Sequence, residues 1–335
     1  MIKPSEEQVK VIACDKSAVV SARPGSGKTF TMARMIVKAS EGLLSYQGVV
    51  AISYTRKASA ELRGRCSDLG VRGGNSFFGT IDAFCLTMII QQFVSHVVGR
   101  KVNIDIADDD RLLPVSRIKD RWGLVCEALS LGVLPVSALS EVAYCMVRHM
   151  PAVRNFLHAR YTAVFIDEYQ DCGLAQHMLF RELVGLGIRG VAFGDMDQAI
   201  FAYDGRSSAF LNELISDPRF MTFEITENHR CHRSIVDYSL KLLDAQASSR
   251  ACQDKRVVLV KVSGDERNIA RTIREHLDAI SERYGVGYRN EFALLSTSNK
   301  MLEWYAGLLG VPSKIVISTK LDVGFSRSRV FFREL

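Results

Sequence analysis

The sequence predicts an α/β protein in which a parallel β-sheet carries helices on both faces. Short apolar runs rich in β-branched residues alternate along the chain with longer segments of helical periodicity. Each of the first four runs is followed by a turn and a helix-like segment, which is typical of parallel strands joined by crossover helices. The predicted strands are residues 18–21, 49–53, 162–166, 191–193 and 221–225.

Two departures from this alternation divide the chain. Residues 103–160 have helical periodicity without strand-like runs, which predicts a helical subdomain inserted into the α/β domain. After Arg230 the pattern restarts, with predicted strands at 256–262 and 291–296 around an amphipathic helix. That helix is expected at residues 265–283. The predicted organisation is a first domain made of 1–102 and 161–230, the insertion 103–160, and the start of a second α/β domain at 231–335.

Composition excludes several classes of protein. The chain is 47% hydrophobic and 24% charged, which is ordinary for globular proteins and excludes disordered, collagen-like and coiled-coil chains. The net charge of +6 is concentrated in residues 1–104, where basic side chains outnumber acidic ones two to one. A basic N-terminal region fits an anionic partner such as phosphate or nucleic acid, although a surface charge of this size is also common.

Cysteine spacing and hydropathy indicate the cellular compartment in which we expect the protein. The eight cysteines include no CxxC pair, so we expect reduced, mostly buried thiols and neither a zinc ribbon nor a disulfide framework. The N-terminus MIKPSEEQ lacks the apolar core of a signal peptide, and polar residues interrupt the apolar stretch 84–98. We therefore expect a soluble cytoplasmic protein with no membrane partner.

The segment ARPGSGKT at 22–29 predicts a phosphate-binding loop (P-loop) between a strand and a helix. Its glycines let successive backbone N–H groups point at a phosphate, and the following helix adds the positive end of its dipole. Lys28 is expected to reach the β- and γ-phosphates, and the Thr29 hydroxyl to bind Mg²⁺. The alternative is a glycine-rich turn that binds nothing. The candidate nucleotide-binding residues are Gly25, Ser26, Gly27, Lys28 and Thr29.

Two carboxylates follow the predicted strand at 162–166. Ligands bind beyond the carboxyl ends of parallel strands, which would place both carboxylates beside the phosphate loop. Asp167 is suited to hold Mg²⁺, and Glu168 to take a proton from an attacking water molecule. The alternative is a solvated acidic turn.

Six motifs follow one another along the chain: ARPGSGKT, SYTRKASAELRGR at 53–65, GTIDAF at 79–84, IDEYQD at 166–171, GDMDQAIFAYDGR at 194–206 and ENHR at 227–230. Together and in this order they resemble superfamily 1 helicases of the UvrD/Rep type. The resemblance covers residues 4–235 strongly and 256–312 more weakly. It implies a P-loop RecA-like fold, a partial second RecA-like domain, and the cofactors ATP and Mg²⁺.

The resemblance also implies roles for residues around the nucleotide. Gln8 matches a glutamine that reads adenine, although the pattern Ser5-x-x-Gln8 also fits a helix capping box. Gln198 matches a glutamine at the γ-phosphate or the lytic water, and Arg230 matches an arginine at the γ-phosphate. His229 stands where a tyrosine usually stacks on adenine. The implied catalytic residues are thus Glu168, Gln198 and Arg230.

Four residues match positions that line a single-strand track in this family: Tyr54, Thr55, Thr80 and Tyr203. Aromatic faces stack on bases without reading sequence, and hydroxyl groups hold phosphates. The alternative for the two tyrosines is ordinary packing at a strand end. Three residues depart from the family pattern, namely Arg56, Asp82 and Asp204, and Asp82 puts an anion near the expected track.

The resemblance predicts an ATP-dependent helicase that translocates on single-stranded or tailed DNA, 3′ to 5′. The alternative is an ATP-regulated DNA-sensing subunit beside a partner nuclease, because ARPGSGKT resembles the helicase subunits of Gabija anti-phage systems. A small-molecule kinase is disfavoured by the motifs DEYQD and GDMDQ. The family's later motif TxHxxKGLE and its second γ-phosphate arginine are not found before Leu335. We therefore expect this chain to bind ATP better than it hydrolyses it.

Overall fold

The computed structural model describes residues 3–71, 74–107, 121–196, 209–244, 254, 256–287, 292–296 and 298–310. The chain divides into two compact units, residues 1–254 and 255–335. Each unit is considered by itself below.

The first unit is built on a parallel sheet with strand order β3-β2-β6-β7-β1-β8. All five strands predicted for it are present, and the strand at 221–225 matches residue for residue. β3 was not predicted, because a three-residue strand is too short to show a period. The sheet consists of β1 (Ala18–Ala22), β2 (Gly48–Ile52), β3 (Phe77–Gly79), β6 (Tyr161–Ile166), β7 (Arg189–Gly194) and β8 (Met221–Ile225).

Helices follow the strands as the alternation predicts. α2 begins at Lys28, where the sequence placed the start of the helix behind the phosphate loop. The helices of this unit are α1 (Glu6–Ala13), α2 (Lys28–Ala39), α3 (Arg56–Asp68), α4 (Ile81–Phe84), α5 (Gln91–Val98), α6 (Arg121–Leu131), α7 (Leu139–His149), α8 (Pro151–Arg160), α9 (Leu174–Gly185), α10 (Ala209–Ile215) and α11 (Arg233–Leu243). Within the described residues, three short helical segments join them: a π-helical turn η1 (Cys85–Ile90) and the 3₁₀ turns η4 (Val136–Ala138) and η5 (Tyr169–Asp171).

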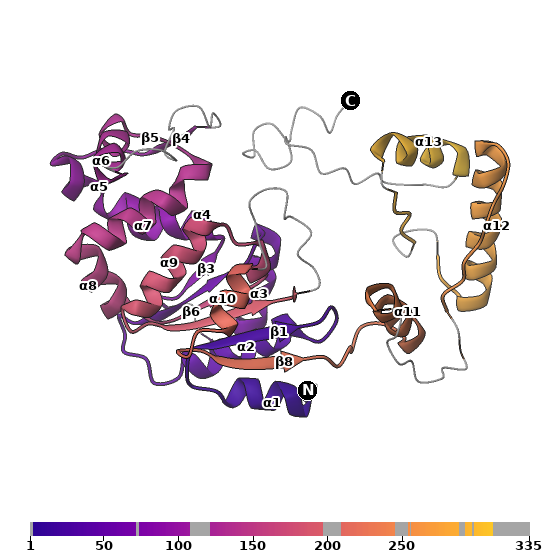
Figure 1. The fold of residues 1–335 in the computed structure, drawn as a ribbon, viewed down its shortest axis with the longest axis horizontal. Helices are drawn as coiled ribbons and strands as arrows, with labels where there is room; N and C mark the ends of the chain where they lie inside the picture. The colour runs from indigo at the N-terminus through magenta and orange to yellow at the C-terminus, as the bar shows by residue number, and fades with distance from the viewer. Residues whose placement is uncertain are drawn as a thin grey trace. The chain divides into compact units, whose positions relative to one another are not determined.

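The inner strands β1, β2, β6 and β7 are buried on both faces, which explains their mainly apolar sequences. In β6 the side chains of Val164 and Ile166 join a core beneath α7, α8 and α9, whereas Ala163 and Phe165 join a second core beneath α1, α2 and α3. Figure 1 shows these two groups of helices on opposite sides of the sheet. The alternation of side chains along each strand therefore divides one sheet between two hydrophobic cores.

The prediction that residues 103–160 lack strands is wrong. β4 (Asp105–Ala107) pairs in parallel with β5 (Val133–Pro135), and the two form a small sheet of their own beside α6 and α7. Strands of three residues leave no alternation to detect, and Pro135 argued against a strand although it is tolerated at the edge of a sheet. The rest of the described insertion is mainly helical, as predicted.

In the second unit the predicted helix is present and the predicted strands are not. α12 (Glu266–Tyr284) begins after Asp265, whose carboxylate accepts the N–H of Asn268. α13 (Asn299–Leu309) was not predicted. Residues 256–262 and 292–296 form no strand, and Val258 and Leu259 are exposed. An apolar run becomes a strand only where its backbone pairs with a second strand, and no strand pairing is present at the described residues 256–262 and 292–296.

The helical stretch Ile81–Val98 is long and apolar enough to cross a membrane by length and composition alone. Its apolar side chains include Phe84, Ile89, Ile90 and Val94, which are buried in the core beneath α7. Core packing accounts for their character. The cytoplasmic location expected from the sequence stays a prediction.

Candidate functional site at the carboxyl edge of the sheet

The predicted phosphate loop and acidic residues meet at one edge of the parallel sheet. β1 leads into the loop, β6 ends just before Asp167, β7 ends just before Asp195, and β8 leads into the ENHR motif. Because these four strands are neighbours in the sheet, motifs up to 200 residues apart in sequence share one surface.

The loop has the backbone that its glycines predict. Gly25 and Gly27 have φ of 75° and 84°, and Gly27 is the N-cap of α2. A Cβ on Gly27 would lie 2.7 Å from Nε2 of Gln8, so the position excludes any side chain. The Ser26 hydroxyl is fully buried, with no hydrogen-bond partner among the described residues. This loop presents backbone N–H groups and a helix N-terminus to an anion.

Side chains from distant segments hold the loop in place. Gln8 is 3% exposed, and its Nε2 donates to the Ser26 carbonyl at 2.9 Å while its Oε1 accepts the N–H of Ser5 at 3.0 Å. The capping box at Ser5 is thus formed, and the Gln8 amide is engaged by protein groups at both ends. Gln8 therefore supports the loop, and an adenine contact would require its amide to change partners.

The segment 227–230 packs against the other side of the loop. Asn228 Nδ2 donates to the Pro24 carbonyl at 2.7 Å, and the His229 N–H donates to the Gly25 carbonyl at 2.9 Å. Asn228 Oδ1 accepts the N–H of Arg230 at 2.9 Å. The side chains of His229 and Arg230 are exposed at this edge. Asn228 thus fixes both candidate residues next to the loop.

An ion pair joins the loop helix to the acidic strand end. Lys28 Nζ lies 2.7 Å from Glu168 Oε2, and the side chains are 13% and 33% exposed. Glu168 has left-handed backbone angles, φ 52° and ψ 46°, which are strained for a residue with a Cβ. Its N–H donates to Asp167 Oδ1 at 3.0 Å, which stabilises the turn. Lys28, which is predicted to contact the phosphates, and Glu168, which is predicted to act as the base, are therefore already in contact with each other.

Gln170 is a site residue that the sequence analysis did not single out. Its Nε2 donates to Glu168 Oε2 at 2.7 Å, and its Oε1 accepts the N–H of Asp195 at 3.0 Å. The side chain is buried between the ends of β6 and β7. Gln170 and Asn228 both lie inside motifs that were recognised, but their partners are 25 and 204 residues away, so sequence alone gave no reason to choose them.

The acidic groups carry uncompensated negative charge. Burial, together with the neighbouring Glu168 carboxylate and against the opposing effect of Lys28, raises the pKa of Asp167 to about 6. Burial also raises the pKa of Asp171, whose Oδ1 has no hydrogen-bond partner among the described residues. Buried carboxylates of this kind favour a nearby cation. Within the described ranges no three His, Cys, Asp or Glu side chains form a complete metal site.

The described single-strand candidates lie further along the same edge. Tyr54 follows β2 and is 45% exposed. The Thr55 hydroxyl accepts the N–H of Ala58 at 3.1 Å and caps α3, and the Thr80 hydroxyl accepts the N–H of Ala83 at 3.3 Å and caps α4. β2 is separated from β1 by two strands, so Tyr54 and Thr55 lie roughly 14 Å along the sheet from the loop. Thr80 follows β3, one strand further out, and lies roughly 19 Å from the loop. Each cap uses an oxygen lone pair, which leaves the O–H proton to donate to a phosphate.

One more residue singled out from the sequence, Asp82, lies within the described part of the chain. Asp82 lies in the first turn of α4, and burial raises the pKa of its carboxyl. Gln198, Tyr203 and Asp204 lie outside the described residues.

Comparison with known proteins gives a family model and several relatives that match this chain. A family model described as the UvrD/REP helicase N-terminal domain matches residues 4–128 and 124–219. Gabija protein GajB from Bacillus cereus is 27% identical over 246 residues, covering 70% of this chain and 48% of that protein. ATP-dependent DNA helicase UvrD1 from Mycobacterium tuberculosis is 24% identical over 386 aligned positions, covering 94% of this chain and 49% of that helicase.

The chain therefore spans about half the length of these two curated relatives. Among solved structures, Pif1 helicase from Candida albicans aligns with a TM-score of 0.38 at 14% identity, over 83% of this chain and 54% of that chain.

Proposed function

Because this chain belongs to the UvrD/REP helicase family, we propose that it binds ATP and Mg²⁺ at the carboxyl edge of its sheet and couples hydrolysis to movement along single-stranded DNA. The observation that carries this proposal is the contact between Lys28 and Glu168 at 2.7 Å. It joins a phosphate-binding loop to a carboxylate on a strained turn, which is the pairing that hydrolysis of a phosphoanhydride needs.

The chemistry of the site fits Mg²⁺. Asp167 is a buried carboxylate whose pKa, about 6, marks an unbalanced negative charge, and Thr29 lies in the first turn of α2 beside the loop. We assign Thr29 and Asp167 to the ion, with the nucleotide phosphates as its other ligands. When bound, Mg²⁺ neutralises charge on the β- and γ-phosphates.

The protein residues then divide the remaining tasks. Lys28 leaves Glu168 for the nucleotide phosphates, and this exchange releases the Glu168 carboxylate to accept a proton from the attacking water. Gln170 keeps Glu168 oriented through its hydrogen bond at 2.7 Å. Arg230 and Gln198 are assigned to the γ-phosphate, and His229 to the adenine ring, on the strength of the family resemblance.

The single strand is assigned to the neighbouring part of the edge. Tyr54 offers an exposed ring for stacking, and Thr55 and Thr80 offer hydroxyl protons to phosphates. Tyr203 is assigned to the same track. The direction of movement, 3′ to 5′, comes from the resemblance alone.

ATP hydrolysis by the 335-residue chain, measured with and without oligothymidylate, tests this proposal. We expect the strand to stimulate hydrolysis, and its binding to weaken steeply with salt and to show little sequence preference. An ATP hydrolysis rate that is the same with and without oligothymidylate, or a sequence-specific footprint on duplex DNA, would contradict the proposal.

The second candidate function is an ATP-regulated DNA sensor that acts with a nuclease. The observation in its favour is the similarity to Gabija protein GajB over 70% of this chain. Gel-shift measurements with the partner nuclease present and absent, and with ATP or a non-hydrolysable analogue, distinguish the two. A sensor should bind DNA ends tightly only with the nuclease and ATP, whereas a motor should bind single strands alone.

A further inference from the structure

One buried hydroxyl at the carboxyl edge of the sheet has no part in the chemistry assigned above. Ser53 directly follows β2 and is 1% exposed. Its Oγ is buried and has no hydrogen-bond partner among the described residues. Because a buried hydroxyl without a partner costs free energy, Ser53 needs a partner that a ligand of this edge could supply.

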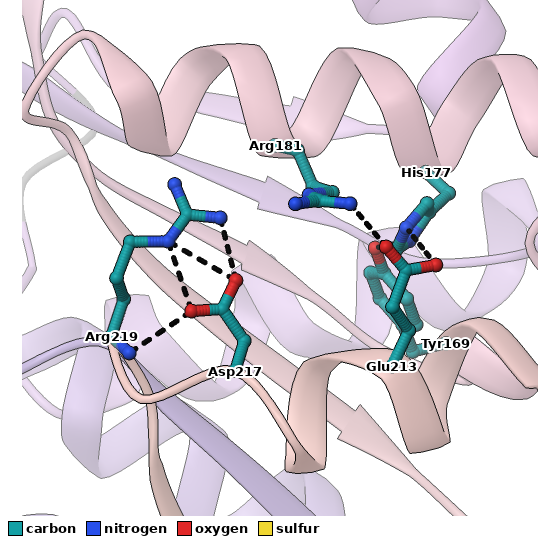
Figure 2. Close-up of polar contacts among 6 residues, drawn as sticks. All are labelled: Tyr169, His177, Arg181, Glu213, Asp217 and Arg219. Carbon is teal, nitrogen blue, oxygen red and sulfur yellow. Dashed lines mark hydrogen bonds and ion pairs between the residues drawn. The ribbon is translucent and has the colours of Figure 1, made fainter.

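Other fully buried hydroxyls of the first unit have protein partners. The Tyr169 hydroxyl lies 2.9 Å from Nδ1 of His177, as Figure 2 shows, and the Thr31 hydroxyl donates to a carbonyl of the phosphate loop at 3.1 Å. Two serine hydroxyls in the described part of the chain are buried without a partner, namely those of Ser26 in the phosphate loop and Ser53. Both lie at the edge assigned to the nucleotide, which indicates that their partners belong to that site.

The backbone places Ser53 beside Asp167. Ile52 pairs with Ile166 in the parallel ladder of β2 and β6. The N–H of Asp167 then donates to the Ile52 carbonyl at 2.9 Å, which extends the pairing by one residue. Ser53 and Asp167 are therefore neighbours on adjacent strands.

The two side chains extend from the same face of the sheet. Ala51 and Phe165, two positions earlier on each strand, join the core beneath α1, α2 and α3. Because side chains two residues apart on a strand share a face, Ser53 and Asp167 extend toward the side of the sheet that α2 covers. That helix carries Thr29 in its first turn.

Packing does not require a hydroxyl at this position. Ala51, on the same face of β2, is fully buried with no polar atom in its side chain. An alanine in place of Ser53 would remove the unpaired hydroxyl and no apolar contact, so serine is the less stable choice for the fold alone. A role in the neighbouring site accounts for the serine better than packing does.

We propose that Ser53 is a positioning residue for Mg²⁺, and that its hydroxyl holds a water molecule of the ion's hydration shell beside Asp167. The inference rests on the proposed function, which assigns the ion to Thr29 and Asp167. Mg²⁺ loses water reluctantly and keeps several water molecules when carboxylates and phosphates bind it. Loss of a group that supports a metal ion from outside its ligands typically costs about 10–100-fold in metal affinity.

The experiment measures the effect of Mg²⁺ without turnover and without DNA. The affinity of the 335-residue chain for a fluorescent, non-hydrolysable ATP analogue is measured in excess EDTA and in saturating Mg²⁺. The ratio of the two affinities is the Mg²⁺ factor. In Ser53→Ala we expect the affinity in EDTA to be unchanged and the Mg²⁺ factor to fall by about 10-fold.

Urea unfolding in EDTA distinguishes this role from a structural one. The urea midpoint of Ser53→Ala should be no lower than that of wild type, because the variant loses an unpaired buried hydroxyl. If the hydroxyl only holds a structural water molecule, Ser53→Ala should unfold at lower urea and keep the wild-type Mg²⁺ factor, which would overturn the inference.

Two further variants complete the comparison. Ser53→Thr keeps the hydroxyl and should retain the wild-type Mg²⁺ factor. Ser140→Ala is the matched control, because Ser140 on α7 is also buried but its Oγ lies 3.8 Å from Sγ of Cys85, in the core on the other face of the sheet. It should leave the Mg²⁺ factor unchanged.

The outcomes separate this inference from the proposed function. A wild-type Mg²⁺ factor in Ser53→Ala, or equal losses in Ser53→Ala and Ser53→Thr, overturns the inference while the proposed function stands. A wild-type chain that binds no analogue, or whose affinity for the analogue is the same in EDTA and in Mg²⁺, overturns the proposed function itself.

Discussion

The two halves of the carboxyl edge are built in different ways. In the half assigned to the nucleotide, around the phosphate loop, contacts join segments far apart in sequence. Lys28 bonds to Glu168, 140 residues away, and Asn228 bonds to Pro24, 204 residues away. In the half assigned to the single strand, the hydroxyls of Thr55 and Thr80 accept from backbone N–H groups three positions ahead, as caps of their own helices.

The two halves differ in how far their side chains are fixed in place before a ligand binds. The nucleotide half is a fixed cradle whose parts constrain one another, so one substitution should disturb the whole site. The strand half is a row of locally supported groups on an exposed surface, so substitutions there should act one at a time and in small steps. The predictions below test this contrast, beginning with the largest effect.

Lys28→Ala should have the largest effect. It removes the charge that contacts the phosphates and leaves Glu168 without its ion-pair partner. We expect ATP turnover to fall by about 10²–10³-fold, with weaker nucleotide binding. The matched control is Lys38→Ala at the other end of α2, where Lys38 pairs with Asp15 on the surface, and it should change neither quantity. Wild-type turnover in Lys28→Ala would make the loop assignment wrong.

Asp167→Asn should change stability with a defined pH dependence. The ordinary pKa of this carboxyl is 3.8 and the folded value is about 6, so the folded protein holds a proton between these values that the unfolded chain releases. The resulting stabilisation is complete below about pH 4 and is lost as pH rises through about 6. The uncharged variant should therefore be more stable than wild type at pH 7.5, by about 1–3 kcal/mol, with the gap closing below pH 5.

Urea unfolding in EDTA measures this difference. Asp217→Asn is the control of opposite sign, because Arg219 lowers the pKa of Asp217 to about 2. The contribution of Asp217 is present above about pH 4 and is lost only as pH falls through 2, so its variant should be less stable at pH 7.5 and at pH 5 alike. A pH-independent gap in Asp167→Asn would show that this carboxyl ionises normally.

Gly27→Ala tests the cradle sterically. The new Cβ would lie 2.7 Å from Nε2 of Gln8, at a φ of 84° that side chains avoid. We expect a loss of about 1–2 kcal/mol in nucleotide binding free energy. Gly64→Ala in α3 is the control, since nothing lies within 4 Å of its Cβ. It should stabilise the fold by about 0.5–1 kcal/mol and leave nucleotide binding unchanged.

Thr55→Ala should give the smallest effect. Loss of the cap of α3 should cost about 1 kcal/mol of stability. Strand affinity should fall several-fold, and nucleotide affinity without DNA should not change. Thr55→Ser restores both the cap and the hydroxyl donor, so it should behave like wild type. If Thr55→Ala also impairs nucleotide binding without DNA, the two halves are not built as differently as described.

The same contrast explains what the sequence could predict. Buried strands such as β6 were found because both faces of the inner sheet demand apolar residues, and the glycines of the loop because only they fit its φ angles. β3, β4 and β5 are too short to show a period. The roles of Gln170 and Asn228 depend on partners that folding brings together. Residues 256–262 were wrongly predicted as a strand because a pattern cannot supply a hydrogen-bonding partner.

The central claim is that Lys28 and Glu168 sit together but act separately, one in binding and one in hydrolysis. The most direct test is Glu168→Gln, with ATP affinity and ATP turnover measured on the same preparation. Glutamine keeps an oxygen that can accept from Lys28 and loses the base. The account predicts ATP affinity within about threefold of wild type and turnover lower by about 10²–10⁴-fold. Undiminished turnover, or loss of nucleotide binding, would contradict it.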